Sequence, residues 1–356
     1  MRTMLLMFLL MRMISATAQQ SLTWFKTFSG KIDKYPVTML LYRSGHAYEG
    51  YYYYNNVQQL ISLRGSDTTS RDSIHLEAYG GQSYEQFTLA IDSDRLNGSW
   101  QKISGAWPKK FEALEVKGPL SFNYISTKGM QKARPALPGS PEATYQAAAV
   151  WPSGESPQAI AVKKTLVKLF TGADTATRDI GILLENDRKK ILANYHKDIL
   201  DATNAEISAS PGLYSVVIQN ILKVCYASSE VLSLAYQNYT YTGGAHGNYG
   251  TSYAAVDLRT NRQLTLEDVV DTKSSTKLGK LIEKKFRLQY QLKPTDSLQV
   301  AGLFDDEIKP TNNFYVTGKG IGFSYTPYEI GPYSLGQVDI FVLFTDLRAT
   351  GICKVQ

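Results

Sequence analysis

The glycine-dense stretch YTGGAHGNYG, at residues 241–250, is the feature that most constrains the fold of this chain. It holds four glycines, two tyrosines and one histidine in ten residues, and it lies between two alternating apolar runs at 231–236 and 253–258. Glycines this dense between two strands indicate positive φ angles or a close approach of backbones. We therefore expect a structural turn built on three of them: Gly243, Gly244 and Gly247.

The single histidine of this stretch, His246, has two interpretations. In the first, its ring forms a hydrogen bond to a neighbouring carbonyl group and stabilises the glycine turn. In the second, it is a site residue. A general base would need a carboxylate partner such as Asp257 or Glu329 within about 3 Å.

With 356 residues, the chain is long enough for two domains. Composition predicts a signal peptide at 1–18, a β-rich domain at 19–128, a Pro-rich linker at 129–156 and an α+β domain at 157–356. The linker prediction rests on Pro135, Pro138, Pro141 and Pro152, with Ala, Gly and Ser between them.

The first residues have the composition of a secretory leader. Arg2 precedes the short apolar run 4–10, and the small residues Ala16-Thr17-Ala18 form a cleavage signal. The apolar run is far below the roughly 20 residues needed to cross a bilayer, and no later segment is apolar enough. The sequence therefore predicts an exported protein without a membrane span, in the periplasm or outside the cell.

Charge and cysteine content narrow the function further. The net charge of +6 comes from basic residues interspersed with acidic ones, whereas nucleic-acid binding needs a clustered basic stripe. Cys225 and Cys353 either pair as a disulfide in an oxidising compartment or are two buried small hydrophobic residues. Neither cysteine lies near a histidine in the sequence, so we predict no metal site and no cofactor.

The first region, from about residue 21 to 128, consists of short alternating segments separated by polar turns such as Ser44-Gly45 and Asn55-Asn56. This spacing predicts an antiparallel meander or a small barrel. The tyrosine-rich strand 48–54 falls in this region. Because successive side chains of a strand point to opposite faces, we expect half of its tyrosines in the core and half on the surface.

The second region mixes helical and strand patterns. Apolar spacing predicts helices at 178–200 and 277–292 and paired strands at 213–227 and 230–242. Further strands are expected at 251–258, 314–316, 321–325 and 337–344. An antiparallel sheet with packed helices makes the predicted fold class α+β.

Three blocks of this second region carry a resemblance to known proteins. The glycine-dense stretch, QLTLED at 263–268 and NNFYVTGKGIGFSYTPYEIGPYSLG at 312–336 occur in the order and spacing of one family. They resemble the extracellular domain of RsiV-type anti-sigma factors, which sense lysozyme, and the accessory region of PdaC-type peptidoglycan deacetylases. The resemblance covers roughly 157–347 and implies a binding partner, either lysozyme or a cell-wall glycan.

Two functions of these relatives are not carried over. The anti-sigma factors have a cytoplasmic segment and a membrane span that this sequence does not show, and no metal-dependent deacetylase motif is present. What remains is a recognition surface, because the prolines of PYEIGPY stiffen a loop and its tyrosines offer large amphipathic area. The binding residues we expect are Tyr328, Glu329, Pro332, Tyr333, His246 and Tyr241.

Catalytic motifs do not support an enzyme. The sequence contains no GxSxG elbow, no HExxH helix and no paired Cys and His. We therefore predict a non-enzymatic binding protein. The alternative is an exported hydrolase of cell-wall or dietary polymers that uses His246 with Asp257 or Glu329.

Overall fold

A computed structural model describes residues 23–67, 73–80, 83–103, 105, 107–174 and 179–355. The predicted signal peptide at 1–18 lies outside the described residues. Within these ranges, no helix combines the length and the apolar character that crossing a bilayer requires.

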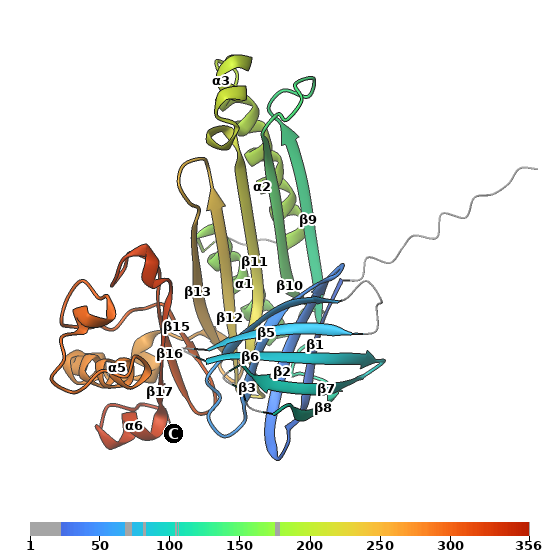
Figure 1. The fold of residues 1–356 in the computed structure, drawn as a ribbon. Helices are drawn as coiled ribbons and strands as arrows, with labels where there is room; N and C mark the ends of the chain where they lie inside the picture. Colours follow the sequence, from blue (N-terminus) through green and yellow to red (C-terminus); the bar gives the residue numbers. More distant parts are fainter. Residues whose placement is uncertain are drawn as a thin grey trace, which may run out of the picture.

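The first part of the chain is a closed antiparallel barrel of eight strands (Figure 1). Its strands are β1 (Thr23–Ile32), β2 (Tyr35–Ser44), β3 (Ala47–Tyr54), β4 (Ile61–Asp67), β5 (Ile74–Gly80), β6 (Ser83–Asp92), β7 (Arg95–Lys102) and β8 (Lys109–Val116). Each strand pairs with the next, and β1 closes the barrel against β8. The predicted antiparallel meander closes into a barrel, so this prediction is confirmed. The alternating segments and the turn residues between them are the sequence features that indicated it.

The centre of the molecule is a six-stranded sheet in the order β14-β13-β12-β11-β10-β9. The strands are β9 (Phe122–Lys132), β10 (Glu142–Pro152), β11 (Val216–Ala227), β12 (Val231–Tyr241), β13 (Asn248–Asp257) and β14 (Arg262–Gln263). All neighbours are antiparallel except β10 and β11, which run parallel. The α+β fold class is confirmed, with this one parallel pair in a sheet that we expected to be antiparallel.

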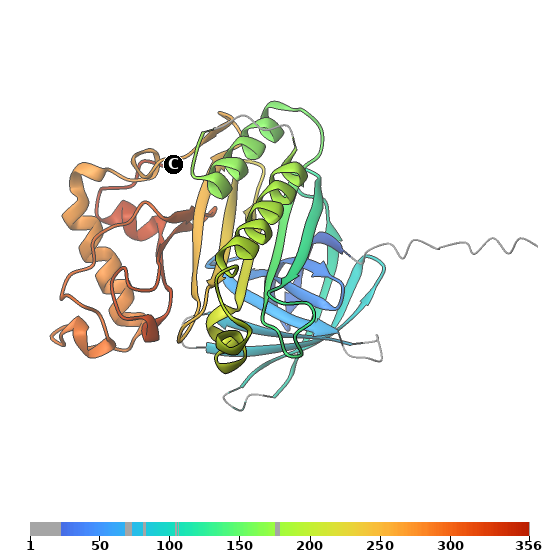
Figure 2. The same ribbon diagram turned by 90° about the horizontal axis from the view of Figure 1, so that it is seen from above.

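Two helices, α1 (Pro157–Thr171) and α2 (Ile180–Asp198), cover one face of this sheet, and the barrel lies on the other side (Figure 2). Helix α1 was not predicted from the sequence. Its start is marked by Ser156, whose side chain accepts a hydrogen bond from the Ala159 amide, followed by a proline at the first helical position. Its end is marked by Gly172 in the left-handed conformation.

The last part of the chain packs along the β13 side of the sheet (Figure 1). It contains a three-stranded sheet of β15 (Phe314–Val316), β16 (Gly320–Tyr325) and β17 (Val338–Leu343), with α5 (Ser275–Gln289) packed against β17. The shorter elements are α3 (Asn204–Ala209), η1 (Pro211–Tyr214), α4 (Leu266–Val269), η2 (Thr272–Ser274), η3 (Leu298–Ala301), η4 (Tyr333–Leu335) and α6 (Phe344–Ala349).

The predicted linker at 129–156 is wrong. Residues 129–132 end β9, and 142–152 form β10, which lies inside the sheet between β9 and β11. Eight of the eleven residues of β10 are buried, including all six from Ala147 to Pro152. A strand whose two faces are both covered does not alternate in polarity, so its pattern is not that of a half-exposed strand.

The barrel shares a core with the central sheet. Met39 and Leu41 of β2 point into the barrel, whereas Leu40 and Tyr42 of the same strand pack on the sheet. The tyrosines of β3 divide in the same way, and four of them are buried: Tyr48, Tyr51, Tyr52 and Tyr53. The expectation that half of these tyrosines face solvent is wrong, because the outer face of β3 is covered by the sheet.

Both cysteines are free thiols, so the disulfide alternative is wrong. Cys225 on β11 is fully buried in a cluster with Tyr51, Tyr253 and Tyr315, where the barrel, the central sheet and the three-stranded sheet meet. Burial raises the pKa of the Cys225 thiol, which keeps it protonated. The backbone of Cys353 forms an isolated antiparallel β-bridge with that of Val270.

One buried tyrosine fastens the barrel to an irregularity in the sheet. The register of β11 against β12 shifts between Val224 and Tyr226, and the Tyr42 hydroxyl meets this position. It donates to the Val224 carbonyl oxygen at 2.8 Å and accepts from the Val224 amide at 2.7 Å. The barrel therefore supplies the hydrogen bonds that the sheet lacks here.

Replacing Tyr42 with phenylalanine is expected to lower the free energy of unfolding by about 1.5 kcal/mol, because two buried backbone groups lose their partner. Urea denaturation monitors this loss. Tyr35→Phe on the same strand is the matched control, since Tyr35 is 51% exposed and its loss of a hydroxyl group should change stability very little. Equal stabilities for the two variants would contradict this role of Tyr42.

Candidate functional site

Two loops that are distant in the sequence meet on one surface. The first joins β12 to β13 and carries the GGAHG turn, and the second joins β16 to β17 and carries PYEIGPY. The ring of Tyr333 stacks on that of His246, with centroids 3.9 Å apart and planes 20° apart. Tyr249 and Tyr328 pack around Tyr333 at centroid distances of 5.6 and 5.8 Å. We call His246, Tyr249, Tyr328 and Tyr333 the aromatic cluster.

Tyr333 joins the two loops. In addition to its stacking on His246, its hydroxyl donates to the Gly247 carbonyl oxygen at 2.7 Å. Partial burial, followed by the neighbouring tyrosines, raises the pKa of the phenol, which therefore stays a donor at neutral pH. The sequence placed His246 and Tyr333 in two separate blocks, and the fold brings them into contact.

The PYEIGPY loop holds a fixed shape. The Tyr328 amide donates to the Gly331 carbonyl oxygen at 3.0 Å, and Tyr328 itself has a φ of 71°. The Glu329 carboxylate accepts from the Thr326 amide at 2.9 Å and lies 3.2 Å from the Thr326 hydroxyl. Pro332 precedes the short helix η4 at its N-cap. These bonds leave the Tyr328 ring 55% exposed at the tip of the loop.

The glycines of the other loop are required by its backbone. Gly243 and Gly244 have φ angles of 88° and 99°. A Cβ atom on Gly247 would lie 2.5 Å from the Tyr239 ring. The Tyr241 hydroxyl lies 3.0 Å from the Gly212 carbonyl oxygen and 3.1 Å from that of Gly244, so Tyr241 supports the turn from below.

Gly243 and Gly244 offer a matched pair of substitutions. A Cβ on Gly243 would lie 2.4 Å from the Leu213 carbonyl oxygen, whereas a Cβ on Gly244 meets nothing within 4 Å. Both alanine variants incur the strain of positive φ, and only Gly243→Ala adds a clash with backbone. Thermal unfolding should show Gly243→Ala less stable than Gly244→Ala by at least about 1 kcal/mol. Equal melting temperatures would contradict the clash.

Of the two carboxylate partners that the hydrolase alternative names, Glu329 lies in the PYEIGPY loop with its carboxylate bonded to the Thr326 amide, and Asp257 is distant from His246. Asp257 pairs with Val231 at the opposite end of β13 from the turn that holds His246. Nine residues of strand separate Asp257 from Asn248, which corresponds to about 30 Å. The His246 ring nitrogen Nδ1 instead lies 3.1 Å from the Gly247 carbonyl oxygen, as the turn-stabilising interpretation expects.

An acidic groove adjoins the aromatic cluster. Its volume is about 660 Å³, and three carboxylates, Asp305, Glu307 and Glu329, line it with a single cation, Lys309. Phe304 is 50% exposed at its side, and the Phe304 amide donates to the Ile330 carbonyl oxygen at 2.9 Å. Glu329 belongs both to this groove and to the PYEIGPY loop, so the two features form one continuous surface.

Of the residues that line this groove, only Glu329 was predicted from the sequence as a binding residue. The run of acidic residues at 305–307 is visible in the sequence, but a charge run usually marks only a solvated turn. Its position beside Glu329 depends on how the chain folds after α5, and local sequence patterns do not predict that path.

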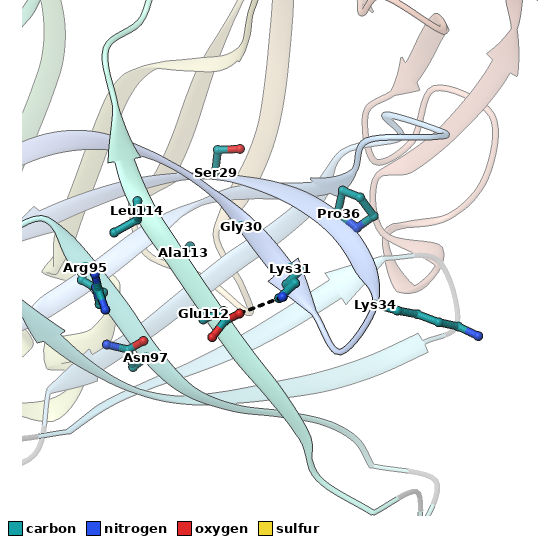
Figure 3. A pocket seen from close by; sticks show the side chains of 10 residues that line it. All are labelled: Ser29, Gly30, Lys31, Lys34, Pro36, Arg95, Asn97, Glu112, Ala113 and Leu114. Atoms are coloured by element: carbon teal, nitrogen blue, oxygen red, sulfur yellow. Dashed lines mark ion pairs between the residues drawn. The ribbon is translucent and has the colours of Figure 1, made fainter.

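A second hollow, of about 490 Å³, lies on the barrel across β1, β7 and β8 (Figure 3). Its charged groups come from separate strands, and Lys31 pairs with Glu112 at 3.0 Å. Glu112 also pairs with Lys110 at 2.6 Å, and its hydrogen bonds with these lysines lower its pKa to about 2. These exposed, mutually paired charges are typical of a solvated barrel surface.

The described residues were compared with the side-chain arrangements that hold metal ions. Within it, no group of three or more His, Cys, Asp and Glu side chains is arranged to hold a metal ion.

Both site loops lie in segments that are similar to described protein families. Residues 267–345 match the family described as "Protein of unknown function (DUF3298)", and residues 141–249 match the family described as "Deacetylase PdaC". No curated protein matches the chain. The second match contains the GGAHG turn and the first contains PYEIGPY, so the resemblance is supported at the level of these domains.

One of two similar solved structures shares the fold at low identity. A member of the DUF3298 family from Bacteroides fragilis is 22% identical, with a TM-score of 0.55, and the match covers 65% of this chain and 94% of that one. A DUF3298 family protein from Pseudomonas aeruginosa is 19% identical, with a TM-score of 0.43, and the match covers 66% of this chain and 95% of that one. Neither description names a ligand.

Proposed function

We propose that this chain is an exported, non-catalytic binding protein of the cell envelope that recognises lysozyme through the aromatic cluster and the acidic groove. The observation that carries the proposal is the stacking of Tyr333 on His246, which joins the two resemblance blocks into one exposed surface. Exposed tyrosines on a loop of fixed shape lose little entropy on binding, which favours protein recognition.

The charge of the groove supports a basic partner. Asp305, Glu307 and Glu329 line the groove with the exposed Phe304, and the exposed Tyr328 directly precedes Glu329 in the chain. Such an arrangement attracts a cationic protein and then offers aromatic contact area once water is displaced. Lysozyme is a basic protein, and it is the partner that the resemblance to the RsiV-type domain implies.

Isothermal titration calorimetry of the whole chain against lysozyme tests the proposal. We expect saturable binding that weakens as ionic strength rises, because surface charge attraction is screened by salt. Cytochrome c, a basic protein of unrelated fold, is the control for attraction by charge alone. The proposal fails if lysozyme gives no binding heat or if cytochrome c binds equally well. Binding of soluble peptidoglycan fragments alone would also contradict it.

Export is a separate part of the proposal. It rests on the leader-like composition of residues 1–18 and the small residues before Gln19. Mass spectrometry of the protein recovered from cell fractions should find a mature chain that begins at Gln19 outside the cytoplasm. A cytoplasmic protein that retains Met1 would refute this part and leave the binding proposal to its own experiment.

A further inference from the structure

A cavity lies where the barrel, the central sheet and the three-stranded sheet meet. Its volume is about 540 Å³, and its walls come from β3, β4 and β5, from β12 and β13, from β15 and β17, and from the end of α5. This size is within the range of small-molecule sites, roughly 300–1,000 Å³, and sites of this kind often form where separate structural units meet.

The lining of this cavity is aromatic and polar without being basic. Of its sixteen lining residues, six are tyrosines, four are glutamines and one is Asp339, and none is Lys, Arg or His. Phenol and amide groups both donate and accept hydrogen bonds, and a tyrosine ring also offers an apolar face. A lining without a cation leaves an anionic ligand unpaired.

The inner wall is held in place by buried hydrogen bonds. The Gln337 side chain accepts from the Thr251 amide at 2.7 Å and donates to the Ser324 hydroxyl at 2.6 Å. Gln237 accepts from the buried Lys223 ammonium at 2.6 Å and donates to the Tyr51 hydroxyl at 3.3 Å. A site whose polar groups are already oriented loses less entropy when a ligand binds.

Asp339 supplies the one acidic group. It lies on β17, with one carboxylate oxygen 3.5 Å from the Gln337 amide nitrogen. Burial raises the pKa of the Asp339 carboxyl group, whereas its hydrogen bonds with Ser324 and Gln337 lower that pKa. A carboxyl group on this wall can accept hydrogen bonds from the hydroxyl groups of a neutral ligand.

We propose that this cavity binds a neutral saccharide. Tyrosine rings pack against the apolar faces of sugar rings, and the glutamine amides and the Asp339 carboxyl group bond to sugar hydroxyl groups. The cavity adjoins the aromatic cluster through Tyr249, which lines its edge and contacts Tyr333. The inference goes beyond lysozyme recognition, since the saccharide site uses the cavity and the protein partner uses the loop surface.

Saturation-transfer NMR and calorimetry with the whole chain test the inference on four probes. The neutral probes are N,N′-diacetylchitobiose and cellobiose, the cationic probe is chitobiose, and the anionic probe is digalacturonate. We expect at least one neutral disaccharide to bind and both charged probes to fail. Diacetylchitobiose and chitobiose differ in their acetyl groups and charge, so this pair compares neutral with cationic recognition on the same sugar frame.

Two variants test whether the saccharide binds in the cavity. Asp339→Ala and Gln289→Ala should each raise the dissociation constant for the neutral disaccharide by about tenfold, because each removes a hydrogen-bonding group from the wall. Leu288→Ala is the matched control, since Leu288 precedes Gln289 on α5 and is 67% exposed. Tyr328→Ala should also leave saccharide binding unchanged, which separates this site from the lysozyme surface.

Several results would overturn the inference: no binding of either neutral disaccharide, binding of a charged probe in preference to them, or equal binding by the wild type and both cavity variants. Circular dichroism checks folding first. If Asp339→Ala does not fold, Gln289→Ala alone decides, because Gln289 lies at the end of a helix and is partly exposed.

Discussion

Replacing Glu49 with leucine is expected to lower the free energy of unfolding by about 3 kcal/mol, because it leaves a buried ammonium group without its carboxylate. Lys223 on β11 has a side chain that is 2% exposed, and it forms an ion pair with Glu49 on β3 of the barrel. Its remaining partner would be the neutral side-chain oxygen of Gln237. This ion pair therefore links the barrel to the central sheet, and breaking it leaves an unpaired charge buried between them.

A double-variant cycle measures this coupling. Lys223→Met with Glu49→Leu removes both charges, so the double variant should recover much of the stability that Glu49→Leu loses. Urea denaturation of the four proteins gives the coupling free energy. A stability loss for Glu49→Leu below about 0.5 kcal/mol, as for an ordinary surface change, would show that water reaches Lys223 and that the pair does not fasten the barrel.

The barrel could be predicted from the sequence because each of its strands is short and ends at a turn with a clear signal. Ser44-Gly45 and Asn55-Asn56 mark two of these turns, and both follow alternating runs. The docking of the barrel could not be predicted. It depends on the outer faces of β2 and β3, where Tyr42 and Tyr53 are buried against residues of β11 that come more than 160 residues later.

Strand β10 shows why composition misled the domain prediction. Its alanines, Ala147–Ala149, are unfavourable in exposed strands, and nearby prolines are typical of linkers. In the fold, these small side chains allow α1 and α2 to approach closely, and β9 and β11 pair along the two edges of β10. Small residues in a fully buried strand carry neither the alternation nor the β-branched composition that identifies strands.

The candidate site was predictable in its parts and not in its assembly. Gly243 and the prolines of PYEIGPY have local conformational reasons that a sequence displays. The stacking of His246 on Tyr333 requires two loops 87 residues apart to meet, and this depends on the three-stranded sheet packing beside β13. The pairing of His246 with Asp257 could not be judged from the sequence for the same reason, since Asp257 is near His246 in sequence but at the other end of a strand.

Tyr328→Ala is expected to weaken lysozyme binding by about 2 kcal/mol or more, roughly thirtyfold, while leaving the fold intact. The Tyr328 ring is 55% exposed at the tip of a loop whose hydrogen bonds involve its backbone and the Glu329 carboxylate. Removing the ring deletes contact area without disturbing those bonds. Tyr35→Ala is the matched control, because Tyr35 is 51% exposed on the barrel, outside the proposed surface.

Tyr333 and Glu329 extend the same experiment. Tyr333→Ala should weaken lysozyme binding at least as strongly, because it also removes the stacking on His246 and the hydrogen bond to Gly247. Glu329→Gln removes one charge from the acidic groove and should reduce the salt dependence of binding more than its strength at high salt. Calorimetry at two ionic strengths separates these effects. If Tyr328→Ala, Tyr333→Ala and the Tyr35→Ala control all bind lysozyme as the wild type does, the aromatic cluster is not the binding surface.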